Sequence, residues 1–341
     1  MAEFRPTGVL VISQMRPCAN DCRFCLLYDK RTYKVSVDRF VSTVRRFLDY
    51  SSGSPITVKQ WFGNSYNFRT EEFAKLYGLF LKNGLGVAGA QNLHYLMLGG
   101  LPFMSGSLAR EWFRARKSLG CGRVSGTYAG LPEAHDRLFR KKGHFRHQLG
   151  LQKIAAGEGY GLMEKVLVLK SNLPDLDRIA SELDLAGPCQ ERYFIPVSYS
   201  GHGRSFEAER PELSDLESLP SRTLDLLKAG LGRWKTEGQW AREILDSGDD
   251  VFEDWLTLRL TDRNQDEIEK KSCSEIISEL TGRTAAAYGG LPGPHDLAER
   301  YADPVSQKLY RTGMEAEALW TDRFLAENPL ADPGCLSRFN W

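Results

Sequence analysis

This sequence has almost no net charge and no long apolar stretch. It carries 45 lysine and arginine residues against 44 aspartate and glutamate residues, so it lacks the basic excess that draws a protein onto nucleic acid. No run approaches the roughly 18 apolar residues of a membrane-spanning helix. The first residues, Met1 to Thr7, are too polar for a secretory signal. We therefore expect a cytoplasmic protein that binds neither nucleic acid nor a membrane.

Cysteine is scarce outside one short stretch. Three of the seven cysteines fall close together, as Cys18, Cys22 and Cys25. The other four are isolated from one another: Cys121, Cys189, Cys273 and Cys335. An odd total with three thiols in one loop favours a reducing compartment over a disulfide framework. The isolation of the remaining thiols argues against a second set of cysteine ligands.

The spacing C-x3-C-x2-C follows a short apolar run that ends at Ile12. Three nearby thiolates are soft donors that suit a metal ion or an iron–sulfur cluster. A closed zinc site needs four ligands, and no cysteine or histidine follows at ligand spacing, since His94 and Cys121 come next. Three ligands on a four-iron cluster leave one iron open to a small molecule. A zinc knuckle and a set of redox thiols are the alternatives.

The same spacing, with Phe24 just before the last cysteine, resembles the signature of the radical SAM superfamily. The resemblance implies that Cys18, Cys22 and Cys25 hold a [4Fe–4S] cluster whose fourth iron binds S-adenosylmethionine. It also implies reductive cleavage to a 5′-deoxyadenosyl radical, which takes a hydrogen atom from the substrate. An electron donor such as flavodoxin or ferredoxin is then a necessary partner.

Strand-like and helix-like runs alternate through the first 200 residues or so, which predicts β/α units on a parallel sheet. Strands are expected over 9–12, 56–62, 93–98, 122–127, 163–169 and 193–199, and helices over 36–50, 70–82, 107–117, 133–156 and 174–183. Interruptions of the fourth helix are expected at Gly143 and Gly150. The resemblance implies an α/β fold, a partial (β/α)6 TIM-like barrel over 1–205. Residues 206–341 are expected to form a mainly helical extension that covers the substrate, with 252–260 readable as strand or helix.

Polar residues follow several of the expected strands. The turn after the second strand holds Gly63, Asn64, Ser65 and Asn67, where radical SAM proteins usually carry a Gly-Gly-Glu-like turn that binds the cofactor. Further cofactor contacts implied by the resemblance are Ser125 on the fourth strand, Lys170 and Ser171 after the fifth, and Val197 on the sixth. The alternatives are an ordinary turn, helix capping and strand core.

Four residues are candidates for substrate contact or catalysis. His202 and Arg204 follow the sixth strand, where an arginine can bind a carboxylate with two parallel hydrogen bonds. His295 belongs to a second copy of a Leu-Pro turn, and Cys335 is a thiol near the end of the sequence. Plain loops and stray thiols are the alternatives.

The segment His135-Asp136-Arg137, with Gly143 and Phe145, resembles the SPASM-type branch of the superfamily, although the C-terminal cysteine set of that branch is missing. Many members of the branch act on peptides, so we expect tailoring of a peptide or amino-acid-derived substrate by crosslinking, epimerisation or rearrangement. The alternatives are natural-product biosynthesis on a sugar, nucleotide or amino acid, and a non-catalytic iron–sulfur or zinc scaffold. The basic run over 137–147 is either a solvated helix face or a docking site for the reductant.

Overall fold

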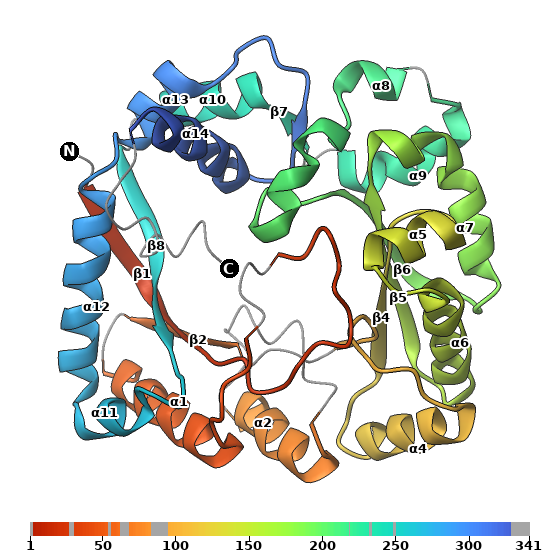
Figure 1. Ribbon diagram of the computed structural model, residues 1–341, viewed down its shortest axis with the longest axis horizontal. Helices are drawn as coiled ribbons and strands as arrows, with labels where there is room; N and C mark the ends of the chain where they lie inside the picture. Colours follow the sequence, from red (N-terminus) through yellow and green to blue (C-terminus); the bar gives the residue numbers. More distant parts are fainter. Residues whose placement is uncertain are drawn as a thin grey trace.

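Parallel strands form the framework of the fold in the computed structural model (Figure 1). It describes residues 3–26, 31–53, 56–61, 68–82, 95–217, 219–231, 234–247 and 250–328. One sheet has the order β2-β1-β8, from Thr57–Trp61, Glu3–Ile12 and Val251–Arg259. The other has the order β3-β4-β5-β6, from Tyr95–Met97, Arg123–Tyr128, Gly161–Val168 and Cys189–Pro196. A short antiparallel pair, β7 (Lys235–Thr236) and β9 (Leu309–Tyr310), lies apart from both.

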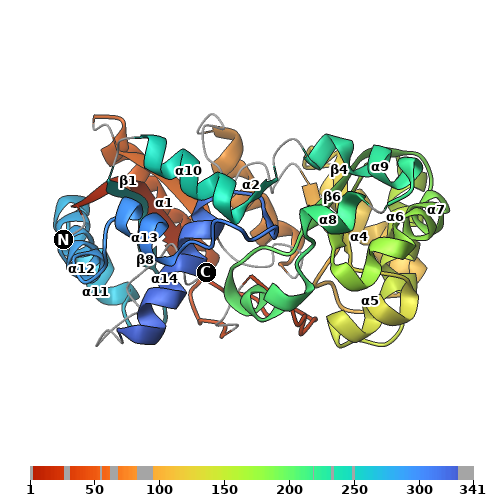
Figure 2. The ribbon, with the colours of Figure 1, turned by 90° about the horizontal axis from the view of Figure 1, so that it is seen from above.

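Helices cover the outer faces of the two sheets, as Figures 1 and 2 show. Those of the first 200 residues are α1 (Val37–Ser51), α2 (Thr70–Lys82), α4 (Gly106–Lys117), α5 (Pro132–Phe139), α6 (His144–Gly157) and α7 (Leu176–Asp184). The later helices are α8 (Leu213–Glu217), α9 (Ser221–Leu231), α10 (Glu237–Ser247), α11 (Gln265–Lys270), α12 (Cys273–Tyr288), α13 (Pro294–Tyr301) and α14 (Gly313–Glu327). Two 3-10 segments, η2 (Lys170–Asp175) and η3 (Gly201–Glu209), follow β5 and β6. The predicted α/β fold with parallel strands and outer helices is confirmed.

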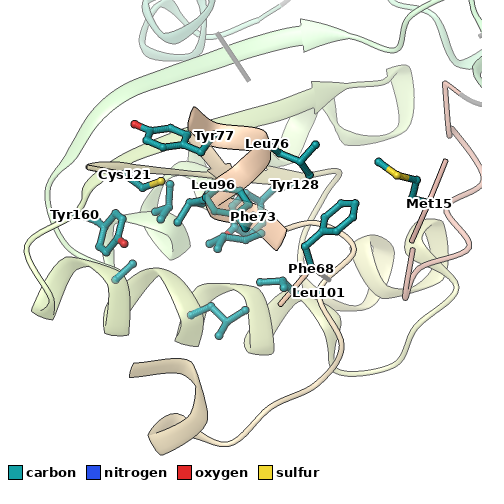
Figure 3. Close-up of a cluster of buried hydrophobic side chains, with 14 of the residues drawn as sticks. Met15, Phe68, Phe73, Leu76, Tyr77, Leu96, Leu101, Cys121, Tyr128 and Tyr160 are labelled. Carbon is teal, nitrogen blue, oxygen red and sulfur yellow. The ribbon is translucent and has the colours of Figure 1, made fainter. Parts of the chain in front are cut away.

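The largest core lies between the strands and the outer helices. Its side chains include Phe73 and Leu76 of α2, Leu96 of β3 and Tyr128 of β4, which Figure 3 draws among their neighbours. These strand residues share one face because successive strand side chains point to opposite faces. The other face of each sheet points toward the middle of the molecule, where the loop after β1 runs.

Two expected helices differ in part from the structure, and the break expected at Gly143 is present. The helix expected over 133–156 is divided at Arg140–Gly143, where Arg140 and Gly143 have positive φ angles of 52° and 77°. Asp136 accepts hydrogen bonds from the backbone N–H groups of Gly143 (2.5 Å) and Phe145 (2.9 Å), so the end of α5 caps the start of α6. No break occurs at Gly150, which lies inside α6. Pro174 lies within η2, and α7 begins only at Leu176.

The residues after 206 contribute a strand to the sheet that β1 begins. β8 pairs in parallel with β1 along its whole length, from Glu3 with Val251 to Ile12 with Arg259. Burial alternates along β8, as expected for a strand between two layers. The segment over 252–260, readable from the sequence as strand or helix, is therefore a strand. The domain boundary at 205 stays a prediction.

Across the described ranges, which include every helix named above, none is long and apolar enough to cross a membrane.

Candidate functional site

The loop after β1 leaves its sheet and runs through the middle of the molecule (Figure 1). Its backbone N–H groups at Ala19 and Arg23 donate to the carbonyls of Gly100 (3.1 Å) and Leu138 (2.9 Å). The carbonyl of Cys25 accepts from the N–H of His202 at the start of η3 (2.8 Å). Three separate elements of the β3–β6 side therefore fix the segment that carries the cysteines.

All three cysteines of this loop, Cys18, Cys22 and Cys25, are half-buried thiols outside any disulfide. Among the described residues, no group of three His, Cys, Asp or Glu side chains is arranged to hold a single metal ion. A zinc ion binds its protein ligands at about 2.0–2.3 Å. The thiolates of an iron–sulfur cluster bind separate iron atoms, so a cluster has a different geometry.

An apolar wall lies behind the loop. Cys22 and Phe24 pack against a buried cluster that includes Leu167 of β5 and Val197 after β6. The ring of Phe24 meets that of Phe139 edge to face, with centroids 5.0 Å apart. Soft thiol donors against an apolar shell that limits solvent access fit the requirements of an iron–sulfur cluster.

Gly201 allows η3 to approach the loop closely. Its φ angle is 52°, and a Cβ atom added there would lie 2.2 Å from the carbonyl oxygen of Leu26 and 2.7 Å from that of Cys25. Both neighbours are backbone atoms of the loop, so a side chain at 201 would have to displace the end of the cysteine segment.

A buried polar chain holds the middle of the loop. The Asn20 amide lies 2.9 Å from Nε2 of His144, and Nδ1 of His144 lies 2.8 Å from Nε2 of His135. The N–H of Ala129, just after β4, donates to Nδ1 of His135 at 3.3 Å. Burial lowers the pKa of both histidines, that of His144 to about 3, so both rings are neutral at pH 7.

Lys141 brings a positive charge to the same place. Its ammonium group donates to Oδ1 of Asn20 (3.1 Å) and to the carbonyl of Leu101 (3.2 Å). Burial lowers the pKa of Lys141, and the neighbouring Cys18 and Cys22 act in the opposite direction. A cation held beside two thiols favours their thiolate forms.

The basic run over 137–147 is thus only partly a solvated face. Arg137, Arg140, Lys142 and Arg146 are exposed, as that interpretation requires. The interpretation as a solvated face is wrong for His144, whose side chain is 1% exposed. Lys141 faces the cysteine loop. The His-Asp segment was a recognisable signal here, but the pairing of His144 with Asn20 joins residues that are far apart in the sequence.

The predicted cofactor residues differ in what surrounds them. Ser125 is 2% exposed, and within the described residues its buried hydroxyl has no hydrogen-bond partner. Val197 lies in the apolar wall behind the loop. The Lys170 ammonium is bound by Glu212 (2.7 Å), and the Ser171 N–H donates to Glu209 (3.1 Å). Gly63, Asn64, Ser65 and Asn67 lie outside the described residues.

Two of the predicted catalytic candidates lie beside the loop. The backbone N–H of His202 donates to the carbonyl of Cys25, while the His202 side chain is exposed. Arg204 is close by, but its guanidinium is bound to the half-buried Asp322 and faces the Tyr199 ring at 5.6 Å. It therefore already has a carboxylate partner from α14.

His295 lies at the opposite end of the sheet. Its N–H donates to Asp250 (2.9 Å), the residue just before β8 begins, whereas the cysteine loop follows the end of β1. Because β1 and β8 are parallel, these are opposite edges, so the structure does not bring His295 to the cysteines, and its contact with the substrate stays a prediction. Cys335 lies outside the described residues.

A groove of about 540 Å³ lies near the start of the cysteine loop, between the first turns of α1 and α2. Two ion pairs line the groove, between Arg16 and Glu72 and between Lys75 and Asp38, each at 2.6 Å. It lies in the outer helical layer and does not contain the cysteines.

The neutral histidines make the fold sensitive to acid. The folded-state pKa of His144 is below the unfolded value near 6.5. The neutral ring therefore contributes to the unfolding free energy above pH 6.5, and this contribution is lost as the pH falls toward 3. We expect the unfolding free energy of the cluster-free chain to fall between about pH 7.5 and about pH 5. The His144→Gln variant should lose about 2 kcal/mol less over that interval. Urea unfolding at both pH values measures this.

The matched control for that measurement is His202→Gln, which removes an exposed ring and should keep the wild-type pH dependence. An unchanged pH dependence in His144→Gln would show that this ring is not held neutral by the fold.

Comparison with known proteins gives only distant similarities. No protein-family model matches the chain, and no curated protein matches it. Crystal structures of SuiB from Streptococcus suis are similar at a TM-score of 0.42. The one bound to precursor peptide SuiA shares 11% identity over 66% of this chain and 45% of that chain. The one bound to S-adenosylmethionine shares 10% over 74% and 51%.

Coproporphyrinogen III oxidase (HemN) from Escherichia coli, which is described as a radical SAM enzyme, is similar at a TM-score of 0.43. It shares 10% identity, over 96% of this chain and 91% of that chain. The present chain spans about half the length of the SuiB structures.

Proposed function

We propose that this chain is a radical SAM enzyme in which Cys18, Cys22 and Cys25 hold a [4Fe–4S] cluster. The observation that carries the proposal is the set of three half-buried thiols on one loop at the C-terminal edge of parallel strands. This edge is where α/β folds of the barrel type bind their ligands. When bound, the cluster and S-adenosylmethionine would supply the 5′-deoxyadenosyl radical that takes a hydrogen atom from the substrate.

The residues around the loop would support that chemistry in three ways. Asn20, His144 and His135 fix the loop through buried hydrogen bonds. Phe24 and Val197 belong to an apolar wall on one side of the cysteines, which would limit the access of water to the group they hold. Lys141 places a positive charge beside Cys18 and Cys22, which favours the more negative, reduced state of the group they hold.

For the cofactor we propose the turn of Gly63, Asn64, Ser65 and Asn67 together with Ser125 and Val197. Ser125 is the best supported, because its buried hydroxyl lacks a partner among the described residues. Lys170 and Ser171 are the least supported, because each already bonds to a glutamate of the following segment.

The substrate we propose is a peptide or an amino-acid derivative, on the strength of the His135-Asp136-Arg137 segment and its SPASM-like pattern. Pull-down with a short peptide encoded beside this chain would test this. Saturable binding supports a peptide substrate, whereas turnover of a free sugar, nucleotide or amino acid without peptide binding would support small-molecule natural-product biosynthesis instead.

For the electron donor we propose a flavodoxin or ferredoxin in the cytoplasm. The exposed Arg137, Arg140, Lys142 and Arg146 provide a basic surface for an acidic partner. This surface contacts the cysteine loop, because Arg140 forms an ion pair at 2.8 Å with Asp21 of that loop.

Anaerobic reconstitution of the full chain with iron and sulfide tests the proposal. We expect iron and sulfide to be taken up in preference to zinc, an electron paramagnetic resonance signal that changes on adding S-adenosylmethionine, and 5′-deoxyadenosine after reduction. Preferential zinc binding without a cofactor-dependent spectral change would support a non-catalytic scaffold and overturn the proposal.

A further inference from the structure

The 3-10 segment η3, which follows β6, lies between the cysteine loop and α14 (Figures 1 and 2). At its first end the N–H of His202 donates to the carbonyl of Cys25 (2.8 Å), and Gly201 leaves no room for a side chain beside the end of the loop. Further along η3, the ring of Phe206 belongs to the apolar cluster behind the loop and lies 5.8 Å from the Arg23 guanidinium. A shift of η3 would therefore move the backbone that carries the third thiol.

Two carboxylates of α14 hold the start of η3 from the other side. The guanidinium of Arg204 pairs with Asp322, and the Arg204 side chain is only 15% exposed. The Tyr199 hydroxyl, just before η3, donates to the same carboxylate at 3.0 Å. The hydroxyl of Ser198 donates to Glu315 in the first turn of α14 at 2.6 Å. The segment that leads from β6 into η3 is thus fastened to α14 by three of its side chains.

The far end of η3 is held by residues around β9. The Glu207 carboxylate accepts from the hydroxyl of Tyr310 (2.6 Å) and lies 3.2 Å from the Lys308 ammonium group. Just after η3, Nη1 of Arg210 donates to a backbone carbonyl of β9 at 3.1 Å. Both ends of η3 are therefore bonded to the segment over 308–322, which comes long after the cysteines in the sequence.

We propose that Arg204 and Asp322 are positioning residues for the cluster: by joining η3 to α14 they hold the backbone of Cys25 in place. This rests on the proposed function, because it takes Cys25 to be a ligand of the cluster. A largely buried ion pair suits this task, since separating its partners leaves a charge buried and uncompensated, which is strongly unfavourable. Residues after 206 would then help to build the cysteine site, in addition to any part they have in covering the substrate.

Alkylation of the thiols in the full, cluster-free chain tests the proposal without requiring turnover. Iodoacetamide is the probe, and mass spectrometry of the peptides gives the rate constant of Cys25 relative to that of Cys18. Cys18 is the reference, because its neighbour Ala19 is bonded to the turn after β3. Asp322→Asn removes the charge that holds η3, so we expect this rate ratio to rise at least about threefold.

Variants of Arg204 test the same ion pair from its other partner. Arg204→Met keeps the apolar stem and loses the charge, so the rate ratio should rise as it does in Asp322→Asn. Arg204→Lys keeps a positive charge for Asp322 and should remain closer to the wild type. After anaerobic reconstitution, iron content should fall at least about twofold in Arg204→Met and Asp322→Asn, since changes behind a metal ligand cost about 10- to 100-fold in affinity.

Asp254→Asn is the matched control, because it makes the same change at another buried carboxylate that binds a tyrosine. Asp254 of β8 accepts a hydrogen bond from the Tyr288 hydroxyl at 2.6 Å. Strand register places it opposite Pro6 near the start of β1, whereas the cysteine loop follows the end of that strand. This variant should lower the melting temperature while keeping the wild-type rate ratio and iron content.

A wild-type rate ratio in Arg204→Met and Asp322→Asn would overturn the proposal. An equal rise in Asp254→Asn would also overturn it, because Cys25 would then respond to global stability and not to the position of η3. If Asp322→Asn does not fold, Arg204→Met carries the test. Failure of the wild-type chain to bind iron and sulfide would instead count against the proposed function, while alkylation of the cluster-free chain would still report on the contact between η3 and the loop.

Discussion

Alanine at Cys22 is expected to abolish stable uptake of iron and sulfide by the purified chain. Each of the three loop thiolates would hold a different iron atom, so no remaining side chain can replace the lost ligand. Changes that only touch residues behind a metal ligand already cost about 10- to 100-fold in affinity, and loss of a ligand should cost at least roughly tenfold. Cys18→Ala and Cys25→Ala should behave alike. Iron and sulfide content after anaerobic reconstitution measures the effect.

Cys121→Ala and Cys189→Ala are the controls for that experiment. Burial raises the pKa of Cys121 to about 11 and that of Cys189 to about 12, so both thiols stay protonated at pH 7 and are poor metal ligands. Both variants should load as much iron as the wild type. Full loading of Cys22→Ala, or equal loss in all these variants, would contradict the assignment of the cluster to the loop.

The local elements could be predicted because their signals lie within a few residues. α2 occupies Thr70–Lys82 as expected, with Glu71 and Glu72 in its first turn where acidic side chains favour a helix start. The fourth helix shows the limit of such signals. Both Gly143 and Gly150 were candidate breaks, and only the capping of α6 by Asp136 decides between them.

The surroundings of the cysteine loop could not be predicted, because they join distant parts of the chain. His144 and Lys141 come more than 100 residues after Asn20, which they both contact. Arg204 looks available for a substrate until Asp322 is found beside it. β8 is ambiguous from periodicity alone, and its pairing with β1 makes it a strand. The spacing of the three cysteines predicts them as ligands, and the fold decides what surrounds them.

The Gly201→Ala variant should lose most of the cluster although it removes no ligand. Alanine is disfavoured at a φ of 52°, and its Cβ would lie 2.2 Å from the Leu26 carbonyl oxygen and 2.3 Å from the carbonyl carbon. These atoms belong to the backbone, so either η3 or the end of the loop has to move. Movement of the loop would weaken the hydrogen bond from His202 to Cys25 and shift the Cys25 thiol relative to its partners. We expect iron content after reconstitution to fall several-fold, together with a loss of about 1–2 kcal/mol in stability.

Gly120→Ala separates backbone strain from the displacement of the loop. Gly120 also has a positive φ, 95°, but an added Cβ would meet nothing closer than the Tyr77 hydroxyl at 3.6 Å. It precedes β4 and so lies at the opposite edge of the sheet from the cysteines. This variant should show a similar loss of stability with wild-type iron content. If Gly120→Ala and Gly201→Ala lose iron to the same extent, cluster binding follows global stability. If only Gly201→Ala loses iron, the close contact of η3 with the loop sets the position of the third thiolate.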